Sequence, residues 1–97
     1  MSDDFFAPPP FKPAEALIQL KRSLRELRPL AERGEGFELQ GGRVIELVHD
    51  EASITVRFAK RVARTPEWER VVLKSGADVR RCVDEARKRL ARWTTEE

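Results

Sequence analysis

The sequence predicts an α+β domain in which two amphipathic helices pack on one face of an antiparallel sheet, as a two-layer sandwich. Apolar residues recur at helical spacing near both ends of the domain and alternate with polar residues in the middle. Turn residues separate the alternating runs. Each helix has one apolar stripe to bury, and a sheet can offer one face to both.

The first segment, residues 1–13, is expected to be an extended N-terminal arm rich in proline and phenylalanine. Proline fixes φ and lacks an amide donor, so this segment fits neither a helix nor a central strand. Its aromatic side chains either lie across the domain or dock on a partner protein. The candidate docking residues are Phe5, Phe6 and Phe11. The domain itself is expected to span residues 14–94.

The first helix is expected over residues 14–33, where five apolar residues repeat at intervals of three and four. These residues are Leu17, Leu20, Leu24, Leu27 and Ala31. Pro29 cannot donate a hydrogen bond to the carbonyl of Arg25, so a kink or a break is expected there. Gly34 and Gly36 then end the element.

A meander of three or four strands is expected to follow, over residues 37–40, 43–49 and 53–60, with 68–74 as the optional fourth. Gly41-Gly42 suits a two-residue hairpin turn, which needs positive φ. In the third range, Ile54, Val56 and Phe58 alternate with polar side chains and indicate one buried face.

The last helix is expected to begin at Ser75, which fits a capping box together with Asp78. Its apolar residues repeat at intervals of four and three. They are Val79, Val83, Ala86, Leu90 and Trp93. Cys82 lies beside this stripe and is expected to be a small buried apolar side chain.

We infer no enzymatic activity, cofactor, metal site or small-molecule substrate. The chain has one histidine, one cysteine and no tyrosine, and no nucleophile with a neighbouring base is evident. His49, Asp50 and Glu51 are adjacent, so their side chains diverge and indicate a polar turn rather than a metal site. With no secretory signal and no long apolar run, the expected location is the cytoplasm, without membrane association.

Charge is distributed unevenly along the chain. From Arg57 to Arg92, twelve basic and five acidic side chains give a net charge of +7, whereas the rest of the chain carries −5. Basic groups around an aromatic side chain can bind phosphates and stack on a base. The alternative is a solvated surface paired with acidic groups elsewhere. The candidate anion- or partner-binding residues are Arg57, Lys60, Arg61, Arg64, Trp68, Arg70, Lys74 and Arg80.

Two functions from different classes follow from these features. The first is a small non-catalytic protein-binding or accessory module, with a homodimer as one form it could take. The aromatic arm favours it, as do the apolar residues on both sides of the 43–49 strand, where Val44 and Val48 lie opposite Ile45 and Leu47. The alternative is a nucleic-acid-binding domain that uses the basic half, residues 57–92.

Overall fold

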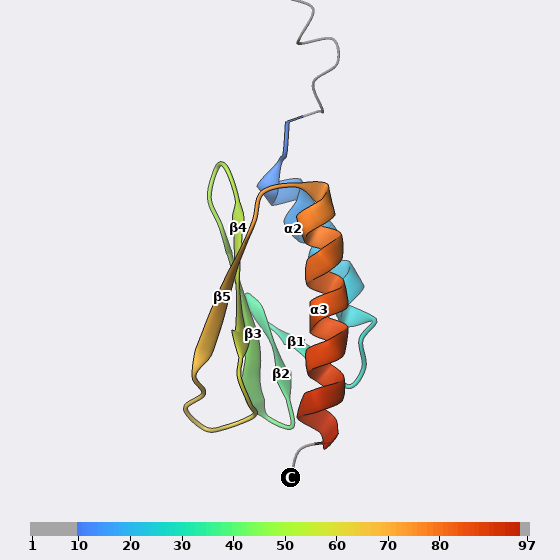
Figure 1. Ribbon diagram of the computed structural model, residues 1–97, viewed down its shortest axis with the longest axis vertical. Coiled ribbons are helices and arrows are strands. Elements are labelled where there is room, and N and C mark those ends of the chain that lie inside the picture. Colours follow the sequence, from blue (N-terminus) through green and yellow to red (C-terminus); the bar gives the residue numbers. More distant parts are fainter. Residues whose placement is uncertain (1–9, 96–97) are drawn as a thin grey trace, which may run out of the picture.

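Within residues 10–95, the chain forms an α+β fold from two helices and a five-stranded antiparallel sheet (Figure 1). The computed structural model describes residues 10–95. In chain order the elements are α2 (Pro13–Arg25), β1 (Ala31–Arg33), β2 (Gly36–Leu39), β3 (Gly42–His49), β4 (Ile54–Ala59), β5 (Trp68–Leu73) and α3 (Gly76–Thr95). The strands lie in the sheet in the order β1-β2-β3-β4-β5, and both helices lie on the same side of it.

Helix α2 is shorter than the helix expected over residues 14–33, because it ends at Arg25, ahead of Pro29. A proline ring excludes a continuing helix, and the chain turns instead through successive bonds from Leu27 N to Leu24 O and from Leu30 N to Leu27 O. Residues 31–33 then pair with β2 as an edge strand. The expected helical role of Ala31 was therefore wrong, and the sheet has five strands within the described residues, where three or four were expected.

The β2–β3 hairpin turns one residue earlier than expected. Its two positive φ values belong to Gln40 (56°) and Gly41 (83°), and Leu39 pairs with Gly42. The register of this pair shifts between Phe37 and Glu38. At the next turn, the Asp50 carboxylate accepts hydrogen bonds from the backbone N–H groups of Ala52 and Ser53, at 2.7 and 2.8 Å. The expected polar turn after His49 is therefore present.

The hydrophobic core lies between the sheet and the two helices. Helix α2 contributes Leu17, Leu20 and Leu24, and α3 contributes Cys82, Ala86, Leu90 and Trp93. The sheet contributes mainly Phe37, Ile45, Leu47, Ile54, Val56, Phe58 and Leu73. Val79 and Val83 are partly buried against this core, as is Phe11. Phe5 and Phe6 lie outside the described residues.

Neither helix within residues 10–95 combines the length and the apolar character needed to cross a bilayer.

Candidate functional site

The side of the sheet that faces away from both helices carries three of the candidate residues, Arg57, Trp68 and Arg70. On β4, Ile54, Val56 and Phe58 are fully buried under the helices, so Thr55 and Arg57 project to the opposite side. Cross-strand partners share a side of the sheet, which extends this surface to β3 and β5. We call it the open face and define it by Arg43, Glu46, Val48, Thr55, Arg57, Trp68, Arg70 and Val72.

Two arginines lie directly opposite each other on the open face. Arg57 of β4 pairs with Arg70 of β5. Three pairs closer to the connecting loop, the N–H of Lys60 donates to the carbonyl of Glu67 with an N···O distance of 2.8 Å, so Lys60 and Glu67 form a hydrogen-bonded pair. Hydrogen-bonded and non-hydrogen-bonded pairs alternate along an antiparallel ladder with two-residue spacing, so Arg57 and Arg70 form a non-hydrogen-bonded pair. Their Cα atoms are then about 4.5 Å apart, the closer of the two spacings.

This arginine pair is only partly neutralised. Arg57 Nη1 lies 3.2 Å from Glu46 Oε1, while Arg70 has no ion-pair partner within residues 10–95. Like charges directly opposite each other destabilise a sheet by about 0.2–1 kcal/mol. The folded chain therefore holds an excess of positive charge at the centre of the open face.

Trp68 lies beside the two arginines. It pairs with Ala59, two positions along the ladder from Arg57 and Arg70 and on the same side of the sheet, and its indole is partly buried. The guanidinium carbon of Arg57 lies 5.3 Å from the centroid of the Trp68 ring, a cation–π distance. The sequence placed Trp68 off the face of Val71 and Leu73, and the register of β5 agrees. The arrangement brings a π surface and two cations together.

Arg43 and Glu46 complete the charged part of the open face, and neither was among the candidate residues expected from the sequence. Arg43 donates to the carbonyl of Arg33 at 2.7 Å, and its Nε lies 3.6 Å from Glu46 Oε2. Glu46 thus lies between Arg43 and Arg57. The signal that could have found Glu46 is the turn at Asp50–Ser53, because that turn sets the register that puts residue 46 opposite residue 57.

At the other end, the open face is apolar. Val48, Thr55 and Val72 form one row across β3, β4 and β5. Val48 is 60% exposed and Val72 is 43% exposed. The open face therefore joins a basic, aromatic region to an exposed aliphatic one.

The structure divides the remaining candidate residues between the two ends of the sheet. Lys60, Arg61 and Arg64 belong to the connection between β4 and β5, at the end where Trp68 begins its strand. Lys74 and Arg80 lie at the opposite end, where β5 leads into α3 (Figure 1). Arg57, Trp68 and Arg70 are brought together, whereas Lys74 and Arg80 are separate from them.

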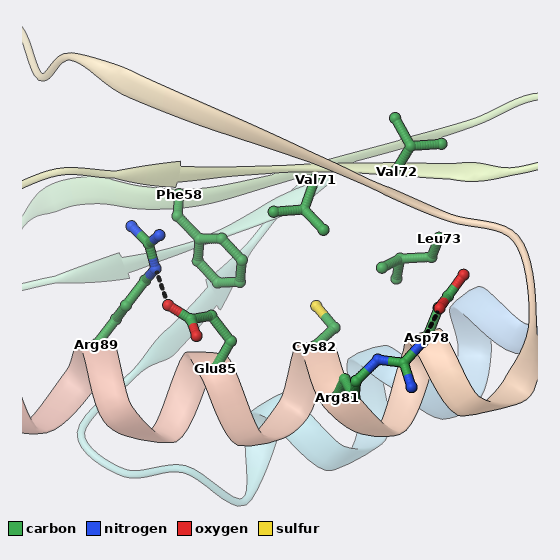
Figure 2. A pocket seen from close by; sticks show the side chains of 9 residues that line it. All are labelled: Phe58, Val71, Val72, Leu73, Asp78, Arg81, Cys82, Glu85 and Arg89. Atoms are coloured by element: carbon green, nitrogen blue, oxygen red, sulfur yellow. Dashed lines mark hydrogen bonds and ion pairs between the residues drawn. The ribbon is translucent and has the colours of Figure 1, made fainter.

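A second concave site lies between β5 and α3, where Cys82 points toward the sheet (Figure 2). Burial raises the pKa of the Cys82 thiol to about 12. At neutral pH this sulfur is therefore protonated and a poor nucleophile. In the part of the chain that the structure describes, no three His, Cys, Asp or Glu side chains gather in a way that could hold a metal ion.

No protein-family model matches this sequence, and comparisons with curated proteins and with solved structures gave no match.

Proposed function

We propose that the protein is a non-catalytic nucleic-acid-binding domain whose open face binds single strands. The observation that carries the proposal is the Arg57–Arg70 pair beside Trp68. Two like charges held opposite each other are unfavourable unless an anion lies between them. A phosphate backbone supplies such anions at regular spacing, and an adjacent aromatic ring supplies a surface on which a base stacks.

The shape of this surface favours single strands over duplexes. Reading a duplex through its major groove requires a protruding helix or a two-stranded ribbon. The basic and aromatic groups here lie on the side of a sheet instead, with Lys60, Arg61 and Arg64 at its margin. Sequence-tolerant binding of single strands combines a basic surface with stacking platforms, and the open face has both.

The test is a fluorescence anisotropy titration of labelled single-stranded DNA and RNA of about 15 nucleotides, a length within the usual site sizes. Titrations at about 50 and about 200 mM salt bracket the range in which phosphate contacts change affinity strongly. We expect binding that weakens with salt. The double variant Arg57→Ala/Arg70→Ala should bind at least about tenfold more weakly, and its salt slope should fall by about 1.4, because a single-strand contact contributes about 0.7.

The matched control removes two cations from the helical layer. Arg22 of α2 and Lys88 of α3 are exposed, and Arg22→Ala/Lys88→Ala changes the net charge by the same amount. We expect this control to keep its salt slope. Equal losses in both double variants would show that net charge alone governs binding. No binding by the unmodified protein at the lower salt would overturn the proposal.

A protein-binding role, which the sequence favoured, is supported by a different observation. Strand β5 lies at the edge of the sheet with one side unoccupied within the described residues.

A further inference from the structure

The outer edge of β5 presents backbone N–H and C=O groups that have no partner within the described residues, and the pairing with β4 shows which residues carry them. Strand β5 has six residues and pairs with β4 on one side only within the described residues. The Lys60–Glu67 hydrogen bond sets the alternation along this ladder. The N–H and C=O groups of Trp68, Arg70 and Val72 are therefore directed away from β4. A strand that joined this edge would bond to these three residues.

Beside this edge runs a trough of about 360 Å³ between β5 and α3. Phe58, Val71, Leu73 and Cys82 form its apolar lining. Its rim carries the ion pairs Asp78–Arg81 and Glu85–Arg89 (Figure 2). An edge strand next to a trough is the geometry of strand addition, in which the backbone provides hydrogen bonds and alternate side chains enter the trough.

We propose that the occupant is β5 of a second copy, paired antiparallel about a two-fold axis at Val71. This inference goes beyond the nucleic-acid proposal and does not rest on it. A continuous sheet requires paired residues on the same side, and the outward backbone groups of one copy must meet those of the other. Registers centred on Glu69, Arg70, Val71 and Val72 all meet these conditions.

Charge selects among these registers. Centring on Glu69 or on Arg70 places that charged side chain opposite its own copy, and centring on Val72 places Arg70 opposite Lys74. Centring on Val71 avoids like charges: Arg70 lies opposite Val72 of the second copy, and Glu69 lies opposite its Leu73. The two Val71 side chains then meet at the axis, on the side of the apolar trough.

The rim of the trough is compatible with a second copy. It contains two acidic and two basic side chains, each acid paired with a base in the same chain. The rim therefore carries no net charge, and two such rims do not repel each other as two like-charged rims would.

The sharpest test is a disulfide cross-link at the axis. In the proposed register the two Val71 residues form a non-hydrogen-bonded pair, with Cα atoms about 4.5 Å apart, within the range that a disulfide spans. In a Cys82→Ala background, Val71→Cys should give a covalent dimer on mild oxidation. The matched control is Val48→Cys, an exposed valine on β3. Cross-linking that is equally fast in the control would overturn the proposal.

A second measurement uses the unmodified chain. Sedimentation velocity should show a concentration-dependent monomer–dimer equilibrium. Val72→Pro removes an outward N–H without touching the bonds to β4, and proline is tolerated on an edge. It should shift the equilibrium to monomer, while Val72→Thr, which keeps the N–H, should not.

A chain that stays monomeric at every concentration, or a dimer that Val72→Pro leaves intact, would overturn the pairing. A monomer that instead binds an added extended peptide would also overturn it and would assign this edge to another protein.

Discussion

The indole N–H of Trp93 donates a hydrogen bond to the main-chain oxygen of Ala59, with an N···O distance of 3.1 Å. This bond joins the last turns of α3 to the end of β4. The β3–β4 ladder stops at Ile45 and Phe58, so the next carbonyl, that of Ala59, receives a side-chain donor instead of a strand. Both residues are buried, and a buried carbonyl without a donor is costly.

Trp93→Phe keeps an aromatic side chain but removes this donor. We expect it to lower the free energy of unfolding by about 1–3 kcal/mol, the cost of an unsatisfied buried acceptor together with the lost contacts. Urea denaturation followed by circular dichroism measures the change. A loss of less than about 0.5 kcal/mol would show that water replaces the indole as donor.

Leu24→Ala tests the core beneath α2. Leu24 is fully buried, so we expect a loss of about 2–5 kcal/mol from the missing contacts and the cavity left behind. Ile18 lies on the same helix and is 60% exposed, which makes Ile18→Ala the matched control. It should change stability by less than about 0.5 kcal/mol. Similar losses at both positions would mean that the buried face of α2 is wrongly assigned.

Arg70→Ala should have opposite effects on stability and on binding. Removing Arg70 relieves the like-charge pair with Arg57, so we expect the free energy of unfolding at low salt to rise by about 0.2–1 kcal/mol. The same change should weaken binding to single-stranded nucleic acid. Denaturation at two salt concentrations, together with the anisotropy titration, measures both. A variant that loses stability at low salt would contradict the repulsion.

Acid should destabilise the protein through carboxylates that the fold keeps charged. The backbone N–H of Lys74 lowers the pKa of Asp78, and those of Ala52 and Ser53 lower the pKa of Asp50. A carboxyl with a lower pKa in the folded state contributes stability above its unfolded pKa, and that stability is lost as pH falls toward the folded pKa. Urea midpoints measured from neutral pH down to about pH 3 should therefore decrease.

Asp78→Asn should flatten this acid dependence, since the amide does not titrate. The control is Asp84→Asn on the same helix, where the carboxylate makes an exposed ion pair with Arg87. Identical pH profiles for Asp78→Asn and the unmodified protein would show that the hydrogen bond from the Lys74 N–H to Asp78 is not a source of the acid sensitivity.

The thiol of Cys82 should react slowly with Ellman's reagent in the folded protein. Its pKa is raised to about 12 by burial, so almost none of it is thiolate at neutral pH. Full and fast reaction is expected in guanidinium chloride. Fast reaction without denaturant would contradict both the burial and the raised pKa.

The spacing of apolar residues in the sequence predicted which side of an element is buried. The alternation of Ile54, Val56 and Phe58 predicted the buried side of β4, and the stripe through Ala86, Leu90 and Trp93 predicted that of α3. The first helix was overextended, because Leu27 and Ala31 continue its apolar spacing while Pro29 prevents the helix from continuing. The apolar spacing alone does not reveal that residues 31–33, which follow the end of the helix, pair with β2 as a strand.

The open face was harder to predict, because it depends on strand register rather than on proximity in sequence. Arg57 and Arg70 are thirteen positions apart and become neighbours only when β4 and β5 align. Lys74 is closer to Arg70 in sequence but lies at the far end of the sheet. Charge density along the chain therefore singles out β4 and β5, but it does not show which of their side chains share one side of the sheet.

The two edges of the sheet are unequal, and this inequality limits how many copies can assemble. Strand β1 has three residues, all exposed, including Glu32 and Arg33, whereas β5 has six. A short charged edge resists pairing with another chain. Two-fold pairing through β5 uses the long edge of both copies and leaves only β1 at the outer ends. Association through this sheet would therefore stop at a closed pair instead of continuing into a fibre.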